Sequence, residues 1–305
     1  MNDANATKVV PHDKVPGANT RESLSSDSAD EEVKLKDVNY SASKTPYVPF
    51  PAVINAYQSG ARMKTFILCG EDKKHRLLRI SVHLGLSGQG PLGTRPGIYL
   101  HNGTSTKDAI LAAAGDEDQW SQRVYVFNNK SVIIVPHLLG DHSDGLAREW
   151  VTELMVASTT RDDAGVSVIF RFAVNSGPGD MFLERETFGW RKFKTGSDKA
   201  YSGGGYKLLR LSCPATGSRD NDSTGDADHS PLAVMELNKG LAKYLDHMYT
   251  LSFVGLGLTG DLGGRWKTMV VVTAARLWIA RLNGKTNKTA VSMAERVQGK
   301  SSTIA

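Results

Sequence analysis

The stretch GRWKTMVVVTAARLWIARL, from Gly264 to Leu282, decides the fold of this chain of 305 residues. From Met269 to Leu282 only Arg276 and Arg281 interrupt the apolar side chains. A bilayer-spanning helix needs about 20 apolar residues, and this run is shorter. It is also longer than a typical strand. We therefore expect no transmembrane segment here.

The composition of the run favours a helix over a strand. Residues 270–273 are β-branched, as in strands, but Ala274 and Ala275 and the residues after them favour a helix. Gly263-Gly264 before the run and Asn283-Gly284 after it are typical of helix ends. A helix that is apolar on every side has to be enclosed by protein. The sequence thus predicts a buried C-terminal helix over residues 264–282.

Short strand-like runs separated by turns precede this helix. They include TFILCGED and HRLLRISVHL around a charged EDKK tip, and GIYLHNG and DAILAAAG around an Asn-Gly turn. In residues 168–174 apolar side chains occupy alternate positions, as in a half-buried strand. Strands can enclose a central helix when their sheet closes on itself. We predict a mainly β fold, a closed antiparallel β-barrel around the buried helix.

The composition along the chain predicts the domain organisation. Residues 1–46 are polar and charged, so we expect a disordered N-terminal arm. The barrel domain spans 47–285 and includes a polar surface insertion at 213–231. Residues 286–305 form a basic C-terminal tail, either frayed or weakly helical.

Charge and cysteine content narrow the class of protein. The formal net charge is +5, which permits an anionic partner. The only two cysteines, Cys69 and Cys213, are far apart in sequence and predict neither a disulfide framework nor a zinc site. The N-terminus lacks the apolar region of a secretory signal. We expect a cytoplasmic protein that can also sit peripherally on a membrane, with the nucleus left open.

Four segments carry a resemblance to a known family: Ile98–Ala114, Glu184–Lys194, Gly205–Leu211 and Leu251–Ile279. The chain resembles the tubby C-terminal-like superfamily, which includes the LURP-one-related proteins and the phospholipid scramblases. Within it, the chain looks like a fungal branch of mostly uncharacterised members. The resemblance implies about twelve strands around the helix and binding of phosphoinositides. The sequence shows no scramblase-type cysteine cluster, and no tubby lipid-binding motif matches residue by residue.

Two clusters of basic side chains are the candidate ligand-binding residues. They lie at a hairpin tip and in GWRKFK: Lys73, Lys74 and Arg76, and Arg191, Lys192 and Lys194. Cations interleaved with aromatic residues suit a lipid headgroup or single-stranded nucleic acid. Cations at hairpin tips also simply protect sheet edges. Because no RNA-binding motif is present, we favour anionic phospholipid and expect no nucleic acid.

No catalytic set emerges from the sequence, and we expect no cofactor. The best metal candidate is the loop PHLLGDHSDG, although a solvated loop is the preferred interpretation; its four ligand-type residues are His137, Asp141, His142 and Asp144. We therefore predict a non-enzymatic tubby-like binding or scaffold module that recognises anionic phospholipid. The alternatives are a protein-binding adaptor and, less favoured, a metal-dependent enzyme that uses residues 137–144.

Overall fold

The computed structural model describes residues 38–43, 47–59, 64–118, 128–137, 150–162, 165–180, 183–194, 204–212, 230–238 and 246–301. These residues contain twelve β-strands: β1 (Val53–Ser59), β2 (Thr65–Cys69), β3 (Arg76–His83), β4 (Gly97–His101), β5 (Ile110–Asp116), β6 (Lys130–Pro136), β7 (Trp150–Asp162), β8 (Gly165–Ser176), β9 (Glu184–Phe193), β10 (Gly205–Ser212), β11 (Ala233–Leu237) and β12 (His247–Phe253). Two 3-10 helices, η3 (Pro178–Asp180) and η5 (Gly255–Gly257), and two α-helices, α2 (Gly263–Leu282) and α3 (Lys288–Ser301), complete them.

The strands form one closed barrel in which each strand pairs with its neighbours in sequence. All the pairs are antiparallel, and β12 closes the ring by pairing with β1. Closure leaves no strand edge exposed along the ring, because every strand has a partner on both sides. The predicted closed antiparallel barrel of about twelve strands is confirmed.

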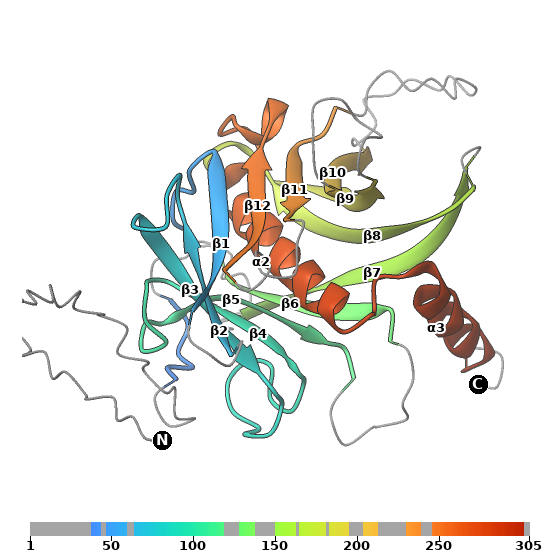
Figure 1. The fold of residues 1–305 in the computed structure, drawn as a ribbon, viewed down its shortest axis with the longest axis horizontal. Coiled ribbons are helices and arrows are strands. Elements are labelled where there is room, and N and C mark those ends of the chain that lie inside the picture. Colours follow the sequence, from blue (N-terminus) through green and yellow to red (C-terminus); the bar gives the residue numbers. More distant parts are fainter. Residues whose placement is uncertain are drawn as a thin grey trace, which may run out of the picture. The chain divides into compact units, whose positions relative to one another are not determined.

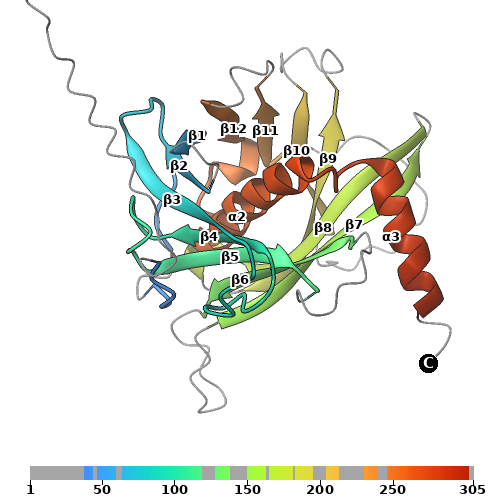
Figure 2. The same cartoon turned by 60° about the horizontal axis from the view of Figure 1, so that its bottom comes forward.

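Helix α2 runs through the ring of strands, as Figures 1 and 2 show. Fifteen of its 20 residues are buried, which covers every side of the helix. A helix is the conformation that suits this place, because it satisfies its own backbone hydrogen bonds where neither water nor a free strand edge is at hand. The predicted bounds, 264–282, differ from the observed bounds by one residue.

Each end of α2 is held by a specific contact. The carboxylate of Asp180, in η3, accepts hydrogen bonds from the backbone N–H groups of Gly264 and Arg265, both at 3.1 Å. At the other end Gly284 has a positive φ of 70°, and the N–H groups of Gly284 and Lys285 donate to the carbonyls of Arg281 and Ala280. This paired arrangement is the Schellman motif. The Asn283-Gly284 stop predicted from sequence is therefore observed.

The antiparallel order defines two ends of the barrel. We call the end at which Asp180 caps α2 the capped end. The odd-numbered strands all end at the opposite end, which we call the exit end because the C-terminal half of α2 lies there. Arg276 of α2 marks it by pairing with Asp116, the last residue of β5, and by donating to the Ser131 hydroxyl, near the start of β6, at 3.1 Å.

The two ends of the chain depart in part from the sequence-based boundaries. Residues 1–37 lie outside the described residues, but 38–43, also assigned to the arm, pair with the β4–β5 hairpin. Ser43 N–H donates to the Ile110 carbonyl at 2.8 Å, and the Ile110 N–H donates back to Ser41. At the other end α3 occupies most of the expected tail and packs against β7 and β8. The tail forms a helix there because Ala290, Val291 and Ala294 share one buried face.

The β4–β5 connection is longer than the Asn-Gly turn predicted there. It spans residues 102–109, and Asn102-Gly103 only begins it. The Asp108 carboxylate accepts a hydrogen bond from the Ser105 N–H at 2.8 Å, which stabilises the longer turn. In contrast, β2 and β3 form the hairpin expected around residues 71–74.

Candidate functional site

The two predicted basic clusters lie far apart on the barrel. One is in the β2–β3 connection and the start of β3, and the other is at the end of β9. In the ring order, β3 and β9 are separated by six steps in either direction. The backbone of the β2–β3 connection follows β2 at the capped end, although the Lys73 side chain reaches Asp246 just before β12, whereas β9 ends at the exit end. The two clusters therefore cannot form a single binding face.

The cluster at the β2–β3 hairpin is largely neutralised by carboxylates. Lys73 Nζ lies 2.5 Å from an Asp246 carboxylate oxygen and 5.6 Å from the centre of the Tyr57 ring. The Asp72 carboxylate accepts the backbone N–H groups of Lys74 and His75, and these bonds lower the pKa of Asp72. The carboxylates of Glu71, Asp72 and Asp246 match in number the cations Lys73, Lys74 and Arg76. This hairpin offers little net positive charge.

The β9 cluster divides between the two sides of its strand. Arg191 is on the outer side, opposite Lys207 of β10. Phe188, Trp190 and Lys192 occupy alternate positions of β9 and therefore lie on the same side of the strand. Phe188 and Trp190 are fully buried in the barrel core, so this is the inner side. Lys194, just after the strand, is two positions further along and continues this alternation on the inner side. Lys192 and Lys194 therefore belong to the mouth of the barrel at the exit end, and Arg191 belongs to its outer wall.

A third cation, Arg281 in the last turn of α2, joins Lys192 and Lys194. Burial lowers the pKa of Lys192, and the positive charges of Arg281 and Lys194 lower it further. We call these three residues the exit cluster. Sequence analysis missed Arg281 because it reads only as a polar interruption of a buried helix; its place in the last helical turn was the available signal.

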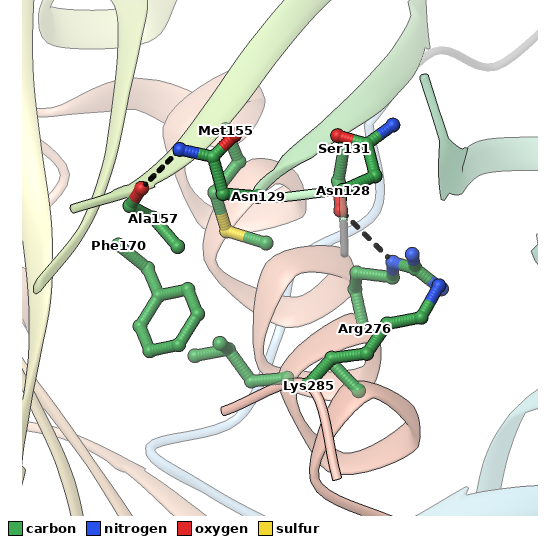
Figure 3. Close-up of a pocket in the computed structure, with 10 residues that line it drawn as sticks. Asn128, Asn129, Ser131, Met155, Ala157, Phe170, Arg276 and Lys285 are labelled. Carbon is green, nitrogen blue, oxygen red and sulfur yellow. Dashed lines mark hydrogen bonds between the residues drawn. The ribbon is translucent and has the colours of Figure 1, made fainter. Parts of the chain in front are cut away.

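A small cavity lies between the C-terminal half of α2 and strands β6, β7 and β8 (Figure 3). Arg276 and Lys285 line it, and both pair with the Asp116 carboxylate, Lys285 at 2.9 Å. Burial raises the pKa of Asp116, but the charges of Arg276 and Lys285 outweigh burial and hold it below its usual value. The free volume of about 20 Å³ holds about one water molecule. The cavity is too small for a substrate, and its charges are paired with one another.

A serine–histidine pair, not predicted from sequence, bears on the enzyme alternative. The Ser81 hydroxyl lies 2.8 Å from His101 Nε2, and His101 Nδ1 lies 2.9 Å from the Asp108 backbone carbonyl. Ser81 is only 4% exposed and His101 is fully buried, so a substrate cannot reach the hydroxyl in this conformation. Burial also lowers the pKa of His101. The pair links β3 to β4 and has the character of a structural contact.

The metal-loop hypothesis falls mostly outside the described residues. Of its four candidates the structure describes His137, directly after β6, while Asp141, His142 and Asp144 are not described. Within the part of the chain that is described, no three His, Cys, Asp or Glu side chains gather closely enough to hold a metal ion. The polar insertion at 213–231 is likewise almost entirely outside the described residues.

Neither helix of the described part has the length and apolar composition that crossing a bilayer requires. No protein-family model, curated protein or solved structure matches this chain. The candidate site therefore rests on the geometry of the exit cluster alone.

Proposed function

We propose that this protein is a tubby-like binding module that recognises anionic phospholipid at a membrane surface through the exit cluster. The observation that supports this function is the gathering of Lys192, Lys194 and Arg281 at one mouth of the barrel. Like charges held together raise the free energy of the unliganded protein, and a phosphate group placed among them would relieve that repulsion. A phosphoinositide headgroup, with several phosphates, suits such a cluster best.

Two carboxylates at the end of β5 are engaged by cations outside the cluster. Asp116 is shared between Arg276 and Lys285, and Glu117 lies 3.6 Å from Lys130. The β2–β3 hairpin is less suitable because its cations are matched by carboxylates. Of the six residues predicted from sequence, we therefore assign headgroup binding to Lys192 and Lys194, and we add Arg281.

A protein-binding adaptor is the second candidate, and one observation favours it. Leu256 and Leu258, in and beside η5 at the capped end, are 52% and 51% exposed. Exposed leucines two residues apart suit a contact with another protein.

The test is co-sedimentation of the full chain with vesicles of neutral lipid, with and without phosphatidylinositol bisphosphate, at low and physiological salt. Each cation near a membrane surface contributes about 1 kcal/mol, so the double variant Lys192→Glu/Arg281→Glu should weaken binding at least about 20-fold. The matched control, Lys74→Glu/Arg76→Glu, reverses two exposed charges at the capped end and should change binding less than about 3-fold.

Absence of vesicle binding by the wild-type chain would overturn the proposed function. Equal losses in the two double variants would remove the assignment to the exit cluster. A single-stranded RNA that competes more strongly than the phosphoinositide would instead indicate nucleic acid as the ligand.

A further inference from the structure

Exposed leucines accompany the cations at the exit end. Leu84 and Leu86, directly after β3, are 57% and 64% exposed, and Leu282, the last residue of α2, is 50% exposed. Strand β3 is odd-numbered, so its end lies at the exit end together with the end of α2. A singly exposed leucine is common on protein surfaces, but here three stand at the end of the barrel that also bears the exit cluster.

Hydrogen bonds connect the segment that carries Leu84 and Leu86 to the segment that carries Leu282. The connection that begins with Leu84 returns to the barrel at Pro96, whose carbonyl accepts the Asp116 N–H at 2.8 Å. The carboxylate of the same Asp116 binds Lys285, three residues after Leu282, at 2.9 Å. Asp116 therefore holds both leucine-bearing segments to the same point of the barrel rim.

Cations lie next to both leucine-bearing segments. Arg281 directly precedes Leu282 and lies with Lys192 in the exit cluster. Near Leu84, the carbonyl of exposed Lys64 accepts the Val82 N–H at 2.7 Å, which places Lys64 beside the end of β3. Apolar side chains among cations are the combination that binds the boundary between headgroups and acyl chains in an anionic bilayer.

We propose that the protein docks end-on onto an anionic bilayer, with Leu84, Leu86 and Leu282 inserted between the headgroups and Lys64, Lys192 and Arg281 in contact with the phosphates. This inference rests on the proposed function and adds to it the orientation of the barrel and an apolar contribution. In this orientation α2 points its C-terminal end at the membrane, and the capped end, with Leu256 and Leu258, faces away from it.

The experiment compares leucine variants of the full chain on the same vesicles. Leu84→Ser/Leu86→Ser should reduce partitioning onto vesicles about 10-fold, because two apolar side chains no longer leave water. The loss should persist at high salt, since burial of apolar surface is not screened. Leu256→Ser/Leu258→Ser is the matched control: it makes the same change at the capped end, at similar exposure, and should bind as wild type. Circular dichroism and thermal melting should show that both variants are folded.

Each outcome decides between the two claims. A loss confined to the Leu84/Leu86 variant, repeated to a smaller extent by Leu282→Ser, supports end-on docking. Wild-type binding by these variants, together with a loss in Lys192→Glu/Arg281→Glu, overturns the docking mode and leaves the proposed function standing. A loss in the Leu256/Leu258 variant overturns the orientation. If the wild-type chain binds no vesicle, the proposed function and the docking mode both fail.

Discussion

The two ends of α2 differ in the charged side chains that surround them and in what those side chains contact. At the capped end the Asp180 carboxylate is used inside the structure, where it accepts two backbone N–H groups of the helix. Tyr47 covers this end, with its hydroxyl donating to the Pro136 carbonyl at 2.9 Å. At the exit end three cations gather, Lys192, Lys194 and Arg281, and burial together with the charges of Arg281 and Lys194 lowers the pKa of Lys192. The capped end thus uses a carboxylate to hold the start of the helix, whereas the exit end brings cations together.

The capped end also shows how closely the chain packs around the helix. A Cβ at Gly264 would lie 2.9 Å from the Cβ of Tyr47, so only glycine fits. Burial raises the pKa of the Tyr47 hydroxyl, on which the charges of Arg265 and Asp180 act in opposite directions. Contacts this close leave no room for another side chain between Tyr47 and the start of α2.

The largest expected effect comes from the middle of α2, on which both ends depend. Ala275 is fully buried, so Ala275→Asp places a carboxylate in the core without a partner. We expect a cost of about 5 kcal/mol or more, comparable with the whole stability of a domain. Ala52→Asp, the same change at an exposed position, should leave soluble expression and thermal melting almost unchanged. A folded, soluble Ala275→Asp protein would contradict the role of α2 as the buried core.

At the exit end, Asp116→Asn should remove the negative charge that Arg276 and Lys285 share. Leaving the buried Arg276 without its counter-charge should cost about 3 kcal/mol at neutral pH. Because the folded pKa of Asp116 is lowered, its contribution is complete above the unfolded pKa and is lost as pH falls through the folded pKa. Thermal melts from pH 7 down to about pH 2 should therefore bring wild type and variant together at the acid end, since an Asp of normal pKa titrates near 3.9. A constant difference across this range would rule out the ion pair as the cause.

At the capped end, Asp180→Ala should remove the helix cap and cost about 1–2 kcal/mol, as cap removal generally does. Asp180 also has a positive φ of 57°, which adds strain for alanine. Asp180→Asn keeps one acceptor and tolerates this φ, so it should lose less stability in urea titrations. Equal losses in both variants would mean that the charge of Asp180, rather than its hydrogen bonds, holds this end.

The smallest expected effect concerns the Schellman motif at the exit end. A Cβ at Gly284 would meet no atom within 4 Å, so Gly284→Ala introduces only the strain of a positive φ, about 1 kcal/mol. Gly260→Ala is the matched control, since that site is equally open and its φ is not in the positive range. Urea titrations should show a loss in the first variant and little change in the second. Unchanged stability of Gly284→Ala would indicate that the helix end frays.

Much of the fold could be predicted because its signals are local. The apolar run from Met269 and its flanking glycines predicted α2 to within one residue, and the alternation in residues 168–174 predicted part of β8. The prediction of a tight turn at Asn102-Gly103 was wrong because the Asp108 side chain stabilises a longer turn. The exit cluster was only partly predictable, since Lys192 and Arg281 are 89 positions apart (281 − 192) and meet only once the barrel has closed.

The sequence by itself therefore determined the central helix, the β-rich wall around it and the position of its stop at Gly284, because hydrophobic period and glycine conformation act over a few residues. Only the tertiary structure decided which charged side chains come close to one another. The pairing of β1 with β12 completes a ring that puts the two basic clusters six strands apart, gives Lys73 the partner Asp246, and brings Arg281 to Lys192. The physical reason is that electrostatic interactions depend on distance in space, and strand order sets that distance.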